Sequence, residues 1–235
     1  MIGELVPGSV VTEWRLDDAE PVALFPEEAA VVANAVARRQ REFATVRLCA
    51  RLALGRLGVP ESPLTPGTRG EPRWPVGTAG SMTHCDGYRA AAVARASDVV
   101  SLGIDAEPSG PLPDGVLERV SLPEERRHLS ALAARAPEVA WERLLFSAKE
   151  SVFKTWYPLT GRELDFDEAT VEFSRDSATV AEDGTEDGAE SVAGGTFTAR
   201  LLVPGPVVGG TRREGFTGRW LARDGLVLTA IVLTR

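Results

Sequence analysis

Lysine is nearly absent from this chain, in which 26 of the 235 residues are Lys or Arg. Two of the 26 are lysines, Lys149 and Lys154, and both lie in the segment FSAKESVFKTW, residues 146–156. Lysine is a compact point charge on a flexible stem, whereas arginine is a planar fork, so the two are not interchangeable. The composition leaves two interpretations open: drift in a sequence that favours arginine, or a local need for a point charge.

The chain also has few cysteines, and it has no excess of positive charge. Cys49 and Cys85 are the two cysteines of the chain. Two cysteines make neither a disulfide framework nor a metal cluster, so we expect small buried residues in a reducing compartment. The net charge of −8 argues against nonspecific binding to nucleic acid.

Long apolar runs are missing too, so nothing in the sequence predicts a membrane span. The first residues lack a basic region followed by an apolar stretch, and we therefore expect no signal peptide. Apolar residues make up 43% of the chain, which is ordinary for a globular protein with a core. We expect a cytoplasmic protein with neither nucleic acid nor membrane as a partner.

Helices are expected in four places. A first helical region spans residues 26–57, in two pieces, because Pro26 and two acids favour its start and a Gly-Val-Pro segment ends it. A short helix follows at residues 116–120. Ser121 is expected to cap the next helix, on which His128 faces solvent. The last helix is expected to open at residue 136 and to end before Pro158.

Strands are expected at residues 88–96 and 99–104, joined as a hairpin across residues 96–98, and in the C-terminal part at 170–173, 196–203, 216–223 and 226–234. Residues 174–195 are acidic, have little to bury, and are expected to form a flexible loop. Each half of the chain thus ends in a strand hairpin after helical material. The expected fold class is α+β with two similar subdomains, residues 1–109 and 110–235.

Two carboxylates stand at the end of the strand over residues 99–104. Side chains alternate along a strand, so Asp105 and Glu107 point to the same side, and Pro108 ends the ladder. Two such charges repel by about 4 kcal/mol at an effective dielectric near 20. Either one is protonated, or both lie in open water, or a cation sits between them. Oxygen ligands without nearby His or Cys suit Mg²⁺.

The segment with the lysines has the pattern of an amphipathic helix, with apolar residues at helical spacing: Leu145, Ala148, Val152 and Trp156. Glu150 and Lys154 are four residues apart and share a face. They are either a solvated pair worth a few tenths of a kcal/mol or part of a site that supplies partners for Glu150. Lys149 lies about 100° round the helix from Glu150, and we expect it to face away.

Arginines gather on the first helical region: Arg38, Arg39, Arg41, Arg47, Arg51 and Arg56. This cluster is either a solvated helix face or a surface that binds phosphates. His84 follows a patch of small polar residues, 81–83. A lone histidine near a strand is more often structural than catalytic, unless other charged groups converge on it.

Three segments together resemble one family. GIDAE at residues 103–107 and FSAKESVFK at residues 146–154 match motifs of the surfactin-type 4′-phosphopantetheinyl transferases. GEP at residues 70–72, followed by SMTH at residues 81–84, is similar to a third motif of that family. The order and spacing fit, the resemblance covers most of the chain, and it is nearest the actinobacterial, enterobactin-synthetase-like branch.

The resemblance implies two similar halves around a pseudo-two-fold axis, with coenzyme A in the cleft between them. It implies a Mg²⁺ site with these positions: Asp105, Glu107 and Glu150, together with the backbone carbonyl of Ala106. The positions that match coenzyme A-binding residues are Arg39, Arg47, Arg69, Thr83, His84, Asp105 and Lys154. Many relatives carry a lysine in the loop where this chain has residues 65–67, and Arg69 is the candidate to replace it.

The implied reaction transfers the phosphopantetheine arm of coenzyme A to a serine of an apo acyl or peptidyl carrier protein and releases 3′,5′-ADP. Asp105, Glu150 and Lys154 are the expected catalytic residues, with Glu150, or a water that it orients, as the candidate base. Whether Glu150 is ligand or base stays open. A monomer is expected.

Two other functions remain as alternatives. One is a Mg²⁺-dependent phosphohydrolase or nuclease that uses the same carboxylates, although the chain lacks the second acidic cluster of two-metal hydrolases. The other is a non-catalytic module that binds coenzyme A or a carrier. The intact set of Asp105, Glu107, Glu150 and Lys154 argues against it.

Overall fold

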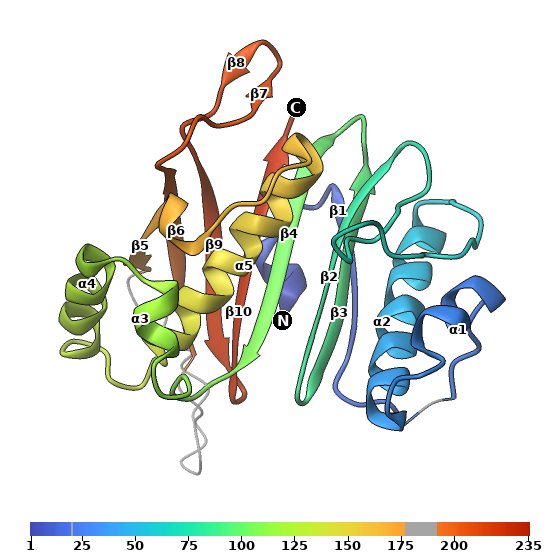
Figure 1. The fold of residues 1–235 in the computed structure, drawn as a ribbon, viewed down its shortest axis with the longest axis horizontal. Helices are drawn as coiled ribbons and strands as arrows, with labels where there is room; N and C mark the ends of the chain where they lie inside the picture. The colour runs from blue at the N-terminus through green and yellow to red at the C-terminus, as the bar shows by residue number, and fades with distance from the viewer. Residues whose placement is uncertain (20, 177–191) are drawn as a thin grey trace.

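The computed structural model describes residues 1–19, 21–176 and 192–235, and every structural statement below concerns these ranges. They form a mixed α/β fold with five α-helices and three sheets. Figure 1 shows the helices on the outer faces of the two larger sheets. No helix in these ranges combines the length and the apolarity that crossing a membrane requires.

The N-terminal sheet is antiparallel, with strand order β1 (Val10–Arg15), β3 (Tyr88–Arg95), β2 (Thr78–Cys85). Helix α2 (Ala37–Arg56) lies against one face and α1 (Pro26–Val32) beside it (Figure 1). Strand β3 is rich in alanine, and its residues alternate between two cores. Ala91 and Val93 pack against α2, while Ala90, Ala92 and Ala94 face the core shared with the second sheet.

The C-terminal sheet has the order β4 (Val99–Pro108), β10 (Leu226–Thr234), β9 (Gly215–Arg223), β6 (Ala193–Leu201), β5 (Ala169–Arg175), and all its pairs are antiparallel. Helix α5 (Trp141–Thr160) covers one face (Figure 1). The smaller elements are η1 (Ile2–Leu5), α3 (Val116–Val120), α4 (Pro123–Ala133), η2 (Phe166–Glu168), β7 (Val207–Val208) and β8 (Thr211–Arg212).

Helix α5 crosses β4 very closely at Gly103. A Cβ atom at this position would overlap the backbone oxygen of Ser151 and crowd the hydroxyl of Thr155. The missing side chain therefore lets the helix backbone approach the strand. This contact sets how far Glu150 and Lys154 on α5 stand from Asp105 on β4.

Side-chain hydroxyls join the two larger sheets along the line where β2 lies beside β4 (Figure 1). The backbone N–H of Ile104 donates to Ser81 Oγ at 3.0 Å, and that of Ala106 donates to Thr83 Oγ1 at 3.1 Å. The edge of β4 that does not face β10 therefore bonds to hydroxyl groups instead of a backbone ladder. We call this junction the β2/β4 seam, and Asp105 lies on it.

The predicted hairpin across residues 96–98 is wrong. Strand β3 pairs with β1 and β2, whereas β4 pairs with β10. The hairpin partner of β3 is β2, across a turn in which Gly87 takes the positive φ of 76° that glycine tolerates. Residues 78–85, which include the small polar patch at 81–83, form strand β2, which was not predicted.

Two helix boundaries also differ from prediction. Helix α5 begins at Trp141, not at residue 136, and Pro158 lies inside its last turn. The helix ends at Thr160 because Gly161 adopts a left-handed conformation and its N–H donates to Tyr157 O at 2.8 Å. The two-piece helix over residues 26–57, the helix at 116–120 and the C-terminal strands are confirmed, within a few residues at each boundary.

Ser121 does not cap α4, which begins after Leu122; its hydroxyl donates to Leu117 O, and the N–H of Leu122 instead donates to Glu125 at 2.7 Å. His128 does not face open solvent. It is half-buried and accepts a hydrogen bond from the N–H of Phe173 at 3.0 Å.

The acidic segment predicted as a loop at 174–195 falls mostly outside the described residues, since 177–191 are not among them. At its two ends β5 runs to Arg175 and β6 begins at Ala193. The subdomain boundary at 109/110 and the pseudo-two-fold relation stay predictions. Strand β4, which precedes that boundary, belongs to the sheet of the C-terminal strands.

Candidate active site

Asp105 is the centre of the site, and it is buried with 4% of its surface exposed. Its Oδ1 accepts a hydrogen bond from Thr83 Oγ1 at 3.1 Å and pairs with Lys154 Nζ at 2.6 Å. Its other oxygen, Oδ2, is buried and has no hydrogen-bond partner among the described residues. Burying an unsatisfied carboxylate oxygen is costly, so this atom indicates a ligand.

Lys154 reaches Asp105 from helix α5, and its ammonium also donates to Ile104 O at 3.2 Å. Arg143, Glu150 and Lys154 are spaced i, i+7 and i+11, so they lie on one face of α5, turned toward the end of β4. Lys154 of this face therefore contacts a β4 carboxylate, whereas Glu150 makes no hydrogen bond or ion pair within the described ranges, and its partnership with the β4 carboxylates stays a prediction.

The remaining carboxylates of the predicted set respond to the charge of Asp105. Burial and the Asp105 carboxylate raise the pKa of Glu107, while Arg143 opposes the rise. Burial raises the pKa of Glu150; Lys154 lowers it, and Asp105 raises it further. A cation among the three carboxylates would relieve both effects.

Oxygen-only donors of this kind fit Mg²⁺, and the unsatisfied Asp105 Oδ2 is the observation that supports the fit. In the described ranges no three His, Cys, Asp or Glu side chains already converge in a metal-binding arrangement. The ammonium of Lys154 lies against Asp105 Oδ1 and supplies the nearest positive charge. Metal binding would therefore require the carboxylates to rearrange about Asp105.

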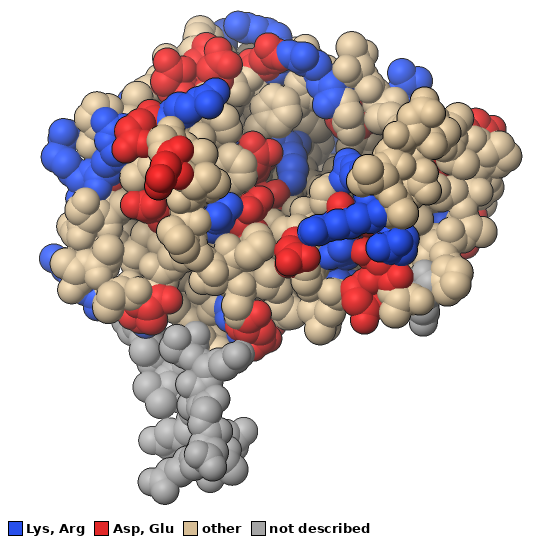
Figure 2. All heavy atoms as spheres, turned by 60° about the horizontal axis from the view of Figure 1, so that its bottom comes forward, with Lys and Arg blue, Asp and Glu red and all other residues tan. Residues whose placement is uncertain are grey.

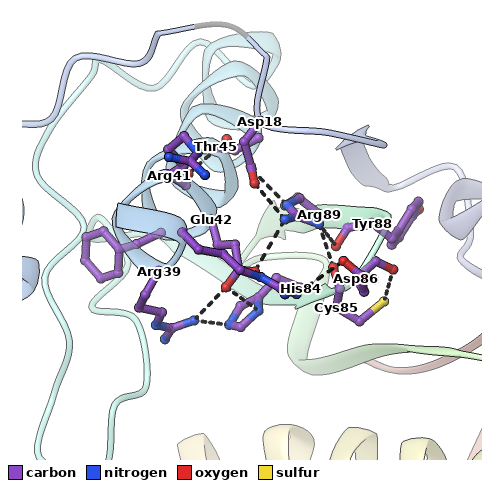
Figure 3. Close-up of polar contacts among 12 residues, drawn as sticks. Asp18, Arg39, Arg41, Glu42, Thr45, His84, Cys85, Asp86, Tyr88 and Arg89 are labelled. Atoms are coloured by element: carbon purple, nitrogen blue, oxygen red, sulfur yellow. Dashed lines mark hydrogen bonds and ion pairs between the residues drawn. The ribbon is translucent and has the colours of Figure 1, made fainter. Parts of the chain in front are cut away.

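A second charged cluster lies on α2 and β2 (Figure 3). Arg39 Nη1 and His84 Nε2 form a short hydrogen bond, and Glu42 lies 3.9 Å from both side chains. Burial lowers the pKa of His84, with Arg39 and Lys154 lowering it further against Glu42. The lowered pKa favours the neutral imidazole of His84 at pH 7, beside an exposed arginine. Other charged groups do converge on it, as the functional interpretation required.

Arg47 is buried. Its Nε donates to Leu64 O at 3.0 Å, and its guanidinium carbon lies 3.1 Å from the centre of the Phe43 ring. Burial lowers the pKa of Arg47 to about 10. Arg51, on the same face, is also buried and pairs with Glu28 at 3.0 Å. The predicted arginine cluster thus divides, because this face points inward while Arg38, Arg39, Arg41 and Arg56 are exposed.

Arg69 lies in the loop between α2 and β2 and forms an ion pair with Glu163, which follows α5. It is half-exposed and has no contact with Asp105 or His84 in the described ranges. The structure thus brings Thr83, Asp105 and Lys154 into contact and joins Arg39 to His84, but it engages Arg69 elsewhere.

Lys149 faces away from the site, as predicted. Its ammonium pairs with Glu125 Oε2 at 2.8 Å and donates to Phe166 O at 2.6 Å and to Ala169 O at 3.1 Å. Glu125 also accepts hydrogen bonds from the N–H groups of Leu122 and Val171. The two lysines therefore have separate roles. Lys149 joins α5 to α4 and β5, and Lys154 pairs with the carboxylate of Asp105.

Sequence reasoning missed Arg143, which pairs with Glu107 at 3.2 Å. The helical spacing of Arg143 from Glu150 and Lys154 indicates that the three residues share a face, but it does not show that Arg143 contacts Glu107. Glu42, which contacts Arg39, His84 and Arg89 in Figure 3, is a further residue of this cluster that no sequence pattern indicated.

The face of the molecule in Figure 2 has a hollow near its middle, with acidic and basic side chains gathered in and around it. A cavity of about 670 Å³ is bounded by α4, the start of α5 and the loop after β4. None of the predicted site residues lines that cavity, although Gly110 and Pro111, close behind Glu107, do.

Two family models match the chain. Residues 27–94 match the 4′-phosphopantetheinyl transferase N-terminal domain, and residues 101–197 match the 4′-phosphopantetheinyl transferase superfamily. The second range contains Asp105, Glu107, Glu150 and Lys154, and the first contains Arg39, Thr83 and His84.

Three characterised relatives are similar over nearly the whole chain. The 4′-phosphopantetheinyl transferase Svp of Streptomyces mobaraensis is 63% identical over 99% of this chain and 89% of its own length. Npt of Nocardia iowensis is 46% identical, over 98% of this chain and 99% of its own. PptT of Mycobacterium tuberculosis is 43% identical, over 99% and 98%. The chain belongs to the 4′-phosphopantetheinyl transferases, in their actinobacterial branch, and is an enzyme that transfers the phosphopantetheine group of coenzyme A to carrier proteins.

Proposed function

We propose that the enzyme is Mg²⁺-dependent, that it attaches the phosphopantetheine arm to a serine hydroxyl of an apo acyl or peptidyl carrier protein, and that it releases 3′,5′-ADP. The observation that carries the proposal is the buried Oδ2 of Asp105, which has no hydrogen-bond partner among the described residues, together with the raised pKa values of Glu107 and Glu150. A divalent cation is the simplest partner for this arrangement.

Asp105, Glu107, Glu150 and the backbone carbonyl of Ala106 are the proposed metal ligands. When bound, Mg²⁺ would neutralise charge on the pyrophosphate of coenzyme A and hold its oxygens for in-line attack. Lys154 has a position that suits phosphate binding, because its ammonium is half-buried and Asp105 holds it in place at 2.6 Å. Thr83 in turn holds the carboxylate of Asp105.

Arg39 and His84 are proposed to bind the remaining phosphates of coenzyme A, since they present an exposed guanidinium beside a neutral imidazole. Arg47 is a weaker candidate because it is buried, but its Nη2 makes no hydrogen bond within the described ranges. Arg69 would have to exchange Glu163 for phosphate. These three sources of positive charge have different exposures and so are expected to contribute unequally.

In the transfer step, the carrier's serine oxygen attacks the phosphorus that bears the pantetheine arm. A new phosphorus–oxygen bond forms, the bond to the second phosphate of the pyrophosphate breaks, and 3′,5′-ADP leaves. Glu150 is the proposed acceptor of the serine proton, and its raised pKa supports this because it makes a carboxylate a better base near neutral pH. Lys154 stabilises the charge that develops on the phosphate oxygens.

The two roles proposed for Glu150 can be separated with Glu150→Gln. A ligand role predicts weaker Mg²⁺ binding in calorimetry. A role as base alone predicts normal Mg²⁺ binding with slow formation of 3′,5′-ADP, measured by chromatography. Unchanged Mg²⁺ affinity together with unchanged turnover would exclude both roles.

Asp105→Ala tests the proposal as a whole, with Asp114→Ala on the exposed loop after β4 as the matched control. We expect the first variant to fold and to lose carrier labelling, and the control to label normally. Full labelling by Asp105→Ala would refute the assignment. Release of inorganic phosphate without carrier modification would favour a phosphohydrolase.

We also propose a monomer in the cytoplasm, organised as the subdomains 1–109 and 110–235, with no nucleic-acid or membrane partner. Fatty-acid, polyketide and nonribosomal-peptide carriers are all candidate substrates. Because the enzyme carries a net charge of −8, acidic carriers are expected to dock on a local patch and not through overall charge attraction. Labelling a panel of apo carriers tests which of these carrier classes the enzyme modifies.

A further inference from the structure

Arg143 stands where helix α5, the end of β4 and the following loop meet. Its Nη1 pairs with Glu107 Oε2 at 3.2 Å, and its Nη2 donates to Pro111 O at 2.5 Å. A longer contact joins Nε to Gly110 O at 3.5 Å. The side chain is 19% exposed, so most of this fork is withdrawn from water. One guanidinium therefore holds both the carboxylate and the loop behind it.

The three carboxylates of the site are held in different ways. Asp105 is fixed by Thr83 and Lys154. Glu107 makes one hydrogen bond to a side chain within the described ranges, and Arg143 is its donor. The second oxygen, Oε1, has no hydrogen-bond partner in those ranges, and alternation along β4 puts Glu107 on the same side of the strand as Asp105.

We propose that Arg143 is a positioning residue: it fixes Glu107 through Oε2 so that Oε1 stays available beside Asp105 for the metal ion. The proposal rests on the assignment of Glu107 as a Mg²⁺ ligand under the proposed function. Arg143 acts through Glu107 and touches neither coenzyme A nor the metal. Partners of this kind orient metal ligands, and their loss costs roughly 10- to 100-fold in metal affinity.

The geometry also predicts that lysine cannot replace Arg143. A lysine has a single ammonium group, so it cannot hold Glu107 and the carbonyls of Gly110 and Pro111 in one plane. Arg143→Lys should therefore lose part of the Mg²⁺ affinity, and Arg143→Gln should lose more of it. If Arg143 only joined α5 to the loop, the substitutions would lower the stability of the protein without this graded loss of Mg²⁺ affinity.

The test measures Mg²⁺ binding to the full chain by titration calorimetry, with no coenzyme A or carrier present. Arg143→Gln should bind Mg²⁺ roughly 10- to 100-fold more weakly than the unmodified enzyme. The matched control is Arg126→Gln, which removes hydrogen bonds to Ser121 at the rim of the 670 Å³ cavity but touches no site carboxylate. Its Mg²⁺ affinity should not change.

A double-mutant cycle with Glu107→Gln shows whether Arg143 acts through Glu107. In that background, Arg143→Gln should cause little further loss of affinity. Unchanged binding in the single variant, or equal losses in both backgrounds, would overturn the proposal. Thermal unfolding of each variant confirms that the folded protein is being titrated.

Failure of the proposed function gives a different result. If the unmodified enzyme binds no Mg²⁺, the metal assignment and the role of Arg143 fall together. If it binds Mg²⁺ and labels its carrier while Arg143→Gln binds equally well, the inference about Arg143 alone is wrong.

Discussion

Replacing Lys149 tests the claim that the two lysines serve different ends. Lys149→Met keeps an unbranched stem of similar size but removes the ammonium. It would leave Glu125, with 1% of its side chain exposed, without its cation, and the carbonyls of Phe166 and Ala169 without their donor. Removing one partner of a buried ion pair costs about 3–5 kcal/mol.

That cost is a large share of the roughly 5–15 kcal/mol by which a folded domain is stable. In a protein of this size 1 kcal/mol shifts the melting temperature by about 2–4 °C, so we expect a fall of about 6–20 °C. Chemical denaturation without coenzyme A or Mg²⁺ gives the free energy of unfolding directly. The free energy of unfolding of Lys149→Met is compared with that of Lys154→Met, which replaces the other lysine and alters the site.

Removing both members of the pair should cost less than removing one, because no buried charge is left behind. The variant Lys149→Met/Glu125→Leu should therefore recover part of the stability lost by Lys149→Met. A free energy of unfolding within about 1 kcal/mol of the unmodified enzyme for Lys149→Met would refute the reasoning.

Three further predictions follow from the site and its supports. Gly103→Ala should lower the free energy of unfolding by about 1–3 kcal/mol and weaken carrier labelling, because its methyl group displaces α5; an unchanged urea midpoint would contradict this. Glu150→Gln should stabilise the metal-free protein at pH 7–8. The raised pKa means that the stability from protonated Glu150 is present below pH 4.5, the unfolded value, and is lost as the pH rises through the folded value. The gain should vanish near pH 4, and a pH-independent difference would argue against it. Asp105→Asn should abolish any rise in melting temperature that Mg²⁺ produces, whereas an undiminished rise would place the metal elsewhere.

Local patterns predicted which residues share a face of one element better than they predicted contacts between elements. Alternation along β4 placed Asp105 and Glu107 on one side, and the spacing on α5 placed Glu150 and Lys154 on one face. Both patterns act within one element, so they can be found without the fold. The separation of Lys149 from Lys154 follows from the same helical geometry.

The β2/β4 seam was not predictable in this way. The hydroxyls of Ser81 and Thr83 replace the backbone ladder, and no periodic pattern indicates such a bond. Without it, the short turn at residues 96–98 suggested a hairpin between two strands that belong to different sheets. Sheet membership depends on contacts between distant segments, here between β4 and β10.

Charge was also a poor guide to exposure. Arg47 and Arg51 were grouped with solvent-facing arginines, yet Glu28, Leu64 and the ring of Phe43 hold them in the interior. Helical periodicity gives no information about a buried carboxylate 19 or more residues away in the sequence, such as Glu28. The same limit hid the partner of Arg143.

The most direct test of the account is the mass of an apo carrier protein after incubation with the enzyme and coenzyme A, with Mg²⁺ or with a chelator. We predict that the carrier gains the mass of the phosphopantetheine arm with Mg²⁺ and the unmodified enzyme, and gains nothing with the chelator or with Asp105→Ala. Equal mass gain in the presence of chelator would contradict the central claim that Asp105 and its neighbouring carboxylates act through a divalent metal.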